Sequence, residues 1–385
     1  MTADGPDDGT FSNLARKARR RLPRLFADYI DGGAHGEHTL HRNRAAFTRW
    51  SVTPRGLRDV SSIDLTTTCF GRTWRLPFFL APVGFAGMFH AQDEAATAHM
   101  AARHSIGMGI STFSIAAMED LVASEADLMA QIYVMRDRAV TRDLLERAKN
   151  CGTSGIIVTI DTAITPVRER DVRNGFLHLS RPTLPQMASL LTRPRWLAGA
   201  VRQGGNRVGN IDRYTTSRGI MAQARDLTAQ IDPTLDWDDL AWLRDAWNGL
   251  LVIKGIMHPA DALRAMTLGA DGIIVSNHGG RQMDPAPGTL DVLPAITEAV
   301  GGRIDIVIDG GIRRGGDVVT ALALSAKAVS FGRPWAWGLA AHGERGVNAV
   351  LELLEREVRD VMALAGLCDT ETVRKAGRAA LWPLA

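Results

Sequence analysis

Eight short apolar runs recur along the chain, and most are bounded by glycine or polar residues. They lie at 77–82, 107–111, 128–133, 155–161, 249–254, 272–276, 304–309 and 326–331. Helical patterns separate most of them, at 93–104, 118–124, 141–151, 259–268, 289–300 and 316–324. Continuous apolar strands that alternate with helices indicate a parallel sheet with both faces covered.

Eight strand–helix units in about 250 residues predict an α/β fold of the (β/α)8, or TIM barrel, class. A doubly wound open sheet is the alternative. Polar residues follow nearly all eight strands, as in a fold whose strand ends surround one mouth, and this favours the closed barrel. We expect a single domain over 1–385. It would have an N-terminal extension (1–76), helical from about residue 11 and packed across the barrel, and an insertion at 177–230.

Composition narrows the class of protein. The net charge of +3 is too mild to indicate nucleic-acid binding. Cys69, Cys151 and Cys368 are few and widely spaced, so we expect neither a disulfide framework nor a metal site. The first 21 residues are acidic and then basic rather than apolar, and no apolar run has the length of a membrane span. We therefore expect a cytoplasmic protein.

The run from Ser276 to Gln282 reads Ser-Asn-His-Gly-Gly-Arg-Gln and follows the apolar stretch 272–275. A buried strand ends there and presents His278 and Arg281 on a loop. Histidine takes up a proton near neutral pH, and arginine binds a carboxylate through two parallel hydrogen bonds. The glycines between them let a flat ligand approach the backbone. A base beside an anion clamp predicts a site for an acid that has a proton to lose.

Residues at the other strand ends form one set of candidate ligands, because all strand ends of a barrel surround the same mouth, where barrel enzymes place their chemistry. The set comprises Pro82, Val83, Gly84, Ser111, Gln131, Tyr133, Thr159, Asp161, Lys254, Ser276, Asp309, Gly310, Gly311, Arg313, Gly332 and Arg333.

Two of these strand ends suggest a phosphate site. The run 309–316 contains four glycines and two arginines, and Gly332-Arg333 follows the last strand. Loops after strands seven and eight are the usual phosphate site of this fold, and backbone N–H groups at glycines suit a dianion. The alternative is that the glycines only make tight turns. A phosphate site here fits FMN, and it fits a phosphorylated substrate as well.

Lys254, at the end of the fifth strand, helps to separate these cases. It is a structural ion-pair partner, a Schiff-base lysine as in a barrel aldolase, or a fixed cation beside a flavin ring. The last interpretation also accounts for the pair of His278 and Arg281, because a lysine there stabilises the negative charge of a reduced flavin.

The 276–282 run resembles the active-site signature of the FMN-dependent 2-hydroxy-acid dehydrogenase/oxidase family. This family includes glycolate oxidase, the flavin-linked L-lactate dehydrogenases and mandelate dehydrogenase. The resemblance covers nearly the whole chain, from Leu22-Pro23 and Asp28-Tyr29 to a helix at 350–365. It implies a (β/α)8 barrel, FMN as cofactor, and two-electron oxidation of an L-2-hydroxy acid to a 2-oxo acid. We further expect a homo-oligomer, a homotetramer.

The resemblance also implies roles for individual residues. His278 looks like the base that takes a proton from the substrate, and Asp161 resembles the carboxylate that orients it. Arg281 and Arg168 resemble the arginines that bind the substrate carboxylate. Tyr29 and Tyr133 look like the tyrosines that hydrogen-bond the substrate, Tyr133 being counted with the catalytic residues. The residues that resemble flavin-ring contacts are Ser111, Gln131, Thr159, Lys254 and Ser276.

Two departures bear on substrate and electron acceptor. Phe113 stands where glycolate oxidase has a tryptophan in the side-chain pocket, and Gly84 stands where the oxidases usually have alanine. Mandelate dehydrogenase and the respiratory lactate dehydrogenases are similar to this chain in having the glycine. This favours a dehydrogenase that uses a quinone or another acceptor on a lactate- or mandelate-like acid. The alternatives are an oxygen-using oxidase that produces hydrogen peroxide, and another FMN barrel enzyme acting on a phosphorylated substrate.

The insertion is strongly basic. Seven arginines and one aspartate lie between residues 177 and 220, among apolar neighbours such as Leu190, Trp196 and Val201. Basic residues with apolar neighbours are typical of segments that lie on an anionic membrane surface. The insertion is therefore either a peripheral contact with the inner face of the cell membrane, or an active-site lid or oligomer contact.

Overall fold

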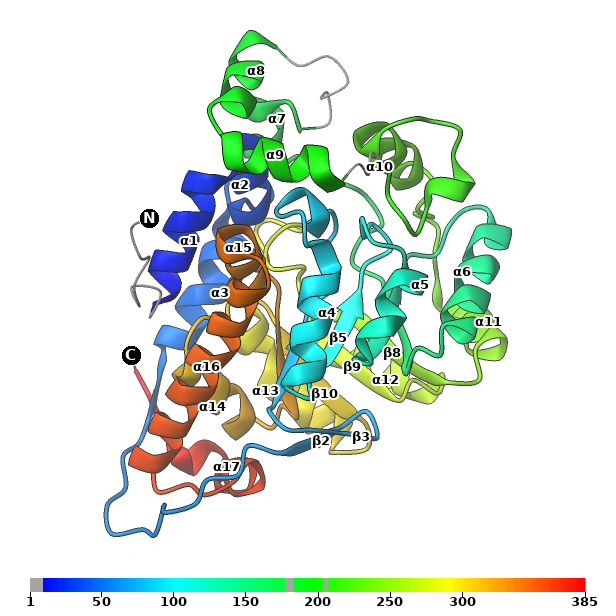
Figure 1. The fold of residues 1–385 in the computed structure, drawn as a ribbon. Coiled ribbons are helices and arrows are strands. Elements are labelled where there is room, and N and C mark those ends of the chain that lie inside the picture. The colour runs from blue at the N-terminus through cyan, green and yellow to red at the C-terminus, as the bar shows by residue number, and fades with distance from the viewer. Residues whose placement is uncertain (1–9, 177–182, 204–206, 385) are drawn as a thin grey trace.

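Eight parallel strands close into a barrel in the computed structural model, which describes residues 10–176, 183–203 and 207–384 (Figure 1). Around the barrel the strands follow the order β10-β11-β4-β5-β6-β7-β8-β9. Their bounds are β4 Phe78–Leu80, β5 Gly107–Ile110, β6 Asp127–Ile132, β7 Gly155–Thr159, β8 Leu250–Ile256, β9 Gly272–Val275, β10 Asp305–Asp309 and β11 Ala328–Phe331. All eight predicted strands are present, and the prediction of a (β/α)8 barrel is confirmed.

Helices alternate with the strands along the chain and pack around them. They are α4 Asp93–Arg103, α5 Met118–Leu121, α6 Arg138–Asn150, α11 Trp237–Ala246, α12 Pro259–Thr267, α13 Thr289–Val300, α14 Gly315–Ala323, α15 Arg333–His342, α16 Glu344–Leu364 and α17 Thr370–Ala376. Six of the predicted helices correspond to α4, α5, α6, α12, α13 and α14. The helix expected at 350–365 lies within the longer α16 except for its last residue, and α11, α15 and α17 lie outside the predictions.

The N-terminal end of the barrel is closed by the hairpin of β2 (Thr67–Cys69) and β3 (Arg72–Trp74). Phe70 and Trp74 join the buried cluster that fills this part of the barrel interior. A Cβ atom at Gly107 would lie 2.6 Å from the Trp74 ring, and one at Gly272 would lie 2.2 Å from the Phe70 ring. Glycine at the first position of these two strands therefore makes room for the aromatic plug.

The N-terminal extension is only partly helical, which corrects the prediction of helices up to residue 76. Helices α1 (Phe11–Arg21), α2 (Arg24–Asp31) and α3 (His38–Thr48) are followed by β1 (Trp50–Val52) and then by the β2–β3 hairpin. Strand β1 pairs antiparallel with β12 (Leu381–Pro383), at the other end of the chain. Helix α2 ends at the mouth of the barrel, so this extension contributes directly to the site described below.

The long connection between β7 and β8 contains the predicted insertion. Helices α7 (Glu169–Asn174), α8 (Leu184–Leu191), α9 (Pro194–Gln203) and α10 (Ile220–Thr228) precede α11. Figure 1 shows α8 and α9 standing beyond the barrel, above α2 and away from α17. Residues 177–182 and 204–206 of the insertion lie outside the described part of the chain.

Candidate active site

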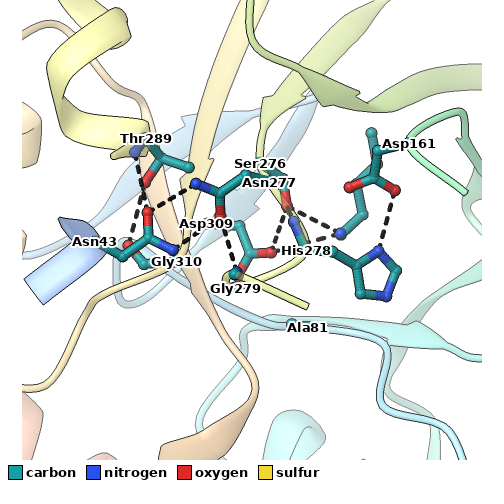
Figure 2. A network of polar contacts seen from close by, with 12 residues as sticks. Asn43, Ala81, Asp161, Ser276, Asn277, His278, Gly279, Thr289, Asp309 and Gly310 are labelled. Carbon is teal, nitrogen blue, oxygen red and sulfur yellow. Dashed lines mark hydrogen bonds and ion pairs between the residues drawn. The ribbon is translucent and has the colours of Figure 1, made fainter. Parts of the chain in front are cut away.

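A histidine–carboxylate pair lies at the mouth of the barrel (Figure 2). His278 follows β9, and its Nδ1 atom is 3.0 Å from Oδ1 of Asp161, which follows β7. Burial raises the pKa of Asp161, but the nearby His278 and Lys254 outweigh it, so the pKa lies below its usual value. Burial lowers the pKa of His278, and Asp161 acts in the opposite direction. The pair therefore consists of an ionised carboxylate and a neutral imidazole whose other ring nitrogen is left for a ligand.

The backbone at His278 is unusual. Its φ angle is +58°, in the left-handed region that non-glycine residues seldom occupy. The main-chain N–H of His278 donates to Oγ of Ser276 at 3.1 Å, which holds the turn. Residues held in such conformations cluster at functional sites. This conformation therefore occurs at the residue whose imidazole contacts Asp161.

Lys254 is buried among polar partners on the adjacent strand. Its Nζ atom donates to Oγ of Ser276 at 3.0 Å. The Ser276 hydroxyl in turn donates to Oδ2 of Asp309 at 2.8 Å (Figure 2). Lys254 lies inside β8 rather than at its end, because the strand continues to Ile256 through an irregularity in its pairing with β9. Gly255 permits this: its φ is +109°, and a Cβ atom there would lie 2.8 Å from Cβ of Asp161.

Two arginines with unused donors face the same region. Arg281 donates from Nη1 to the carbonyls of Tyr29 (2.5 Å) and Gly32 (3.0 Å), and its guanidinium lies 4.6 Å from the centre of the Tyr29 ring. Arg168 is 3.7 Å from Asp171. Burial, and then the charge of Arg281, lower the pKa of Arg168 to about 10. Two partly buried cations that repel one another, each with an unpaired donor nitrogen, indicate that the site is built to receive an anion.

Two tyrosines lie beside these arginines. Tyr29, from α2, stacks on Phe176 with ring centres 4.7 Å apart. Tyr133 packs against Phe113 at 5.6 Å. Burial, and then the charge of Asp161, raise the pKa of Tyr133 well above its usual value. Tyr133 is therefore a neutral phenol that can donate a hydrogen bond at any physiological pH.

A cavity with about 730 Å³ of free space runs from His278 to the loops after β10 and β11. Of the sequence-predicted residues, those that line the cavity are Tyr29, Pro82, Val83, Gly84, Lys254, His278, Arg281, Asp309, Gly310, Gly311, Arg313, Gly332 and Arg333. Ser111, Gln131, Tyr133, Thr159, Asp161, Arg168 and Ser276 are not in that lining, and all lie in or next to the strands and loops that frame the mouth.

The far end of the cavity is basic. Burial, and then the charge of Arg44, lower the pKa of Arg313 to about 10. Arg313 precedes α14, and Gly332-Arg333 begins α15. Arg333 is held by the carbonyls of Ile30, Gly279 and Gly32, each at 2.9 Å. The two helix N-termini and the two partly buried guanidinium groups together favour a phosphate dianion.

Unsatisfied buried atoms test whether FMN fits this cavity. Within the described part of the chain, six buried polar atoms around the mouth have no hydrogen-bond partner: Gln131 Nε2, Thr159 Oγ1, Asp161 Oδ2, Arg168 Nε, Arg281 Nη2 and Ser330 Oγ. Such a group costs about 1–3 kcal/mol when it is left unpaired. Donors and acceptors in the centre, with a basic phosphate site at one end, match a planar heterocycle that carries a phosphate. The residues present therefore fit FMN.

Sequence reasoning missed two contributors to this site. Ser330 lies in β11, where a polar residue within an apolar run was the available signal. Asn43, from α3, exchanges two hydrogen bonds with Asn277, at 2.8 and 2.9 Å (Figure 2). Asn43 Oδ1 also accepts from the N–H of Thr289 at 3.1 Å. This pair of amide side chains holds the 276–282 loop against the N-terminal helices. No local sequence motif indicates that Asn43 and Asn277 contact each other.

No group of three or more histidine, cysteine, aspartate or glutamate residues in the described ranges is arranged to hold a metal ion. None of the helices in those ranges is both long enough and apolar enough to cross a membrane.

Comparison with known proteins adds to this geometry. The family model described as FMN-dependent dehydrogenase matches residues 18–381. The L-lactate dehydrogenase of Caulobacter vibrioides (strain NA1000 / CB15N) is 41% identical over 369 residues, covering 94% of this chain and 96% of the relative. The L-lactate dehydrogenase of Xanthomonas campestris pv. campestris (strain 8004) is 42% identical over 360 residues, covering 92% of each.

Solved structures are similar over almost the whole chain. The monotopic membrane protein (S)-mandelate dehydrogenase has a TM-score of 0.93 and 34% identity, covering 98% of this chain and 100% of its own. A mandelate oxidase variant with a C4a-OH-FMN adduct has a TM-score of 0.80 and 36% identity, covering 94% of this chain and 97% of its own.

Proposed function

The chain belongs to the FMN-dependent dehydrogenase family, and from that premise we propose that it oxidises L-lactate to the 2-oxo acid and passes the electrons to a membrane quinone. The family resemblance is thereby confirmed, and with it the prediction of an FMN-dependent enzyme that oxidises a 2-hydroxy acid. The observation that carries the proposal is the pairing of His278 with Asp161 near two partly buried arginines that have free donors.

One set of residues would bind the substrate, and another would transfer the proton. The free donors of Arg168 and Arg281 would bind the substrate carboxylate, with Tyr29 and Tyr133 as further hydrogen-bond donors. His278 would then take a proton from the substrate on the ring nitrogen that does not face Asp161. The ionised Asp161 stabilises the resulting imidazolium and keeps the ring oriented.

FMN, when bound, accepts the two electrons. Gln131, Thr159, Lys254 and Ser276 would contact its ring, and Arg313 with the glycine loops before α14 and α15 would hold its phosphate. Burial among polar partners keeps Lys254 fixed, so its positive charge is in place before the reaction begins.

L-Lactate is the leading substrate because the relatives at 41% and 42% identity are L-lactate dehydrogenases. A mandelate-like acid is the second candidate, supported by Gly84 beside Phe113 and by the likeness to (S)-mandelate dehydrogenase. Values of kcat/KM for glycolate, L-lactate, (S)-mandelate and a long-chain 2-hydroxy acid decide between them. A higher value for mandelate than for lactate would replace the first candidate by the second.

The quinone assignment is supported by the outer surface of the insertion. Leu184, Met187 and Leu191 on α8 are exposed at three- and four-residue spacing, and Leu197 and Val201 on α9 are exposed four residues apart. Such rows form continuous apolar faces. They would lie in the membrane interface, with nearby arginines at the anionic headgroups.

A vesicle sedimentation assay tests this contact with and without residues 185–206. Binding that requires the segment and weakens with salt supports it. If the intact protein never sediments, or if the deletion changes nothing, the segment is a lid or a subunit contact.

Hydrogen peroxide formed in stoichiometric amounts in air would favour the oxidase alternative. The homotetramer stays a prediction, which the mass from analytical ultracentrifugation checks.

A further inference from the structure

A second cavity lies between α9, the end of α1 and the loop that follows β4. It is an open space of about 1230 Å³. Trp196 on α9 donates from Nε1 to the carbonyl of Met88 at 2.8 Å, and this bond links the insertion to the β4–α4 loop. The cavity is distinct from the one that contains His278, and the mechanism above makes no use of it.

The polar lining of this cavity is positively charged. Arg21, Arg195 and Arg202 line it together with His90, and its described lining contains no aspartate or glutamate. Burial, and then the charges of Arg21 and His342, lower the pKa of His90 to about 4, so that the imidazole is neutral at pH 7. Burial, and then the charge of Arg195, also lower the pKa of Arg21. The charge in the cavity is therefore that of three arginines, without a carboxylate to balance it.

One of these guanidinium groups is held in place. Arg21 donates from Nη1 to the carbonyl of Ala341 at 3.1 Å, and its Nη2 lies 3.2 Å from Nε2 of His90. Two bonds use only part of the five N–H donors of an arginine. The group is thus oriented and keeps donors for an anion, a geometry that suits the oxygens of a phosphate.

The rest of the lining is apolar. Met88, Phe89, Trp196, Val201 and Ile220 form walls beside the arginines. Val201 also belongs to the exposed apolar face of α9, with 73% of its surface accessible. The cavity therefore opens where the proposed membrane contact lies. A ligand that carries a phosphate next to hydrocarbon matches this lining better than a free phosphate does.

We propose that this cavity binds the headgroup of an anionic phospholipid, with the phosphate at Arg21 and Arg195 and the adjoining glycerol and acyl carbons against Trp196 and Val201. The proposal rests on the membrane contact inferred above, and it adds a specific lipid site to what would otherwise be general electrostatic attraction.

The test compares arginine variants that change the net charge equally. Arg21→Gln and Arg195→Gln each remove one charge from the cavity. Arg20→Gln removes one charge from the neighbouring exposed position of α1, outside the cavity lining. The FMN-loaded proteins are titrated with phosphatidylcholine vesicles that contain increasing fractions of phosphatidylglycerol. Loss of a general surface charge weakens binding about fivefold, whereas loss of charge-assisted bonds to the phosphate costs roughly tenfold or more in addition.

We expect both cavity variants to bind these vesicles roughly ten times more weakly than Arg20→Gln. Thermal unfolding midpoints and FMN content serve as controls for folding, and Arg195→Gln removes none of the bonds of Arg21. Equal binding by all three variants would overturn the lipid site and leave the membrane contact standing. Absence of vesicle binding by the unaltered protein would overturn both. Finally, calorimetry compares inorganic phosphate with a soluble short-chain phosphatidylglycerol. If phosphate binds as tightly as the lipid, the cavity is a site for free phosphate instead.

Discussion

Replacing Asp161 by asparagine removes the charge that faces the proposed base, His278, and leaves the volume of the side chain at position 161 almost unchanged. The Oδ1 atom of Asp161 is 3.0 Å from Nδ1 of His278. An ion pair at about this separation contributes about 4 kcal/mol at an effective dielectric constant of 20. That energy corresponds to a factor of roughly 10³. We therefore expect the rate at which L-lactate reduces the bound flavin to fall by about 10²–10³, since only part of the charge develops in the transition state.

The same substitution has a predictable effect on the pH profile. The base acts in its neutral form, so the rate rises as the pH increases through the pKa of His278. Asp161 raises that pKa against the effect of burial. Without the carboxylate the pKa of His278 falls further. In a plot of flavin-reduction rate against pH, the rise therefore moves to lower pH, while the maximal rate at high pH decreases.

Anaerobic stopped-flow absorbance across pH measures both quantities. Asp305→Asn is a suitable control, because Asp305 begins β10 at the opposite end of the barrel and accepts the N–H of Phe70. That variant should keep the rate and pH profile of the unaltered enzyme. A flavin-reduction rate for Asp161→Asn within about twofold of the original, with the rise at an unchanged pH, would refute the role of Asp161 as the partner of the base.

His278→Gln should keep FMN bound and slow flavin reduction by at least about 10²–10⁴-fold, because an amide cannot accept the proton; substantial reduction by substrate would exclude His278 as the base. Arg281→Lys should raise KM and lower kcat, since a compact ammonium group lacks the planar fork that holds two main-chain carbonyls through one nitrogen and directs a second nitrogen at the carboxylate; steady-state constants equal to those of the original would contradict this. Gly84→Ala places a methyl group 3.1 Å from Cβ of Phe113, so it should disfavour aryl substrates and alter the ratio of oxygen to artificial-acceptor activity. Gly56→Ala, where a Cβ atom also meets nothing within 4 Å and which lies outside the cavity lining, should change neither, and parallel behaviour of the two glycine variants would argue against the pocket assignment.

The barrel was predictable because its strands are continuous apolar runs. Every residue of β7 and β9 is buried, as parallel strands covered on both faces require. Helix α11 was missed although Asp236 caps it and Asp239 completes a capping box. Helix α15 was missed because its first turn, at Arg333, was interpreted only as a phosphate loop.

Long-range pairing explains the remaining differences. The segment after Thr48 was expected to be helical, yet Trp50 pairs with Pro383 at the opposite end of the chain. The candidate site was accessible because barrel topology brings every strand end to one mouth. The contacts that support the site could not be predicted, because Asn43 contacts Asn277 only when the N-terminal helices pack against the barrel. Local pattern therefore predicts the residues at strand ends better than the contacts that hold them.

The central claim, FMN-dependent oxidation of L-lactate at this site, is tested most directly by a single turnover. The yellow holoprotein is mixed anaerobically with one equivalent of L-lactate, and flavin absorbance and pyruvate are followed together. We expect loss of the oxidised-flavin absorbance with one pyruvate formed per flavin, and no change with D-lactate. A flavin that stays oxidised with L-lactate and with every other L-2-hydroxy acid, in a protein with full FMN content, would contradict it.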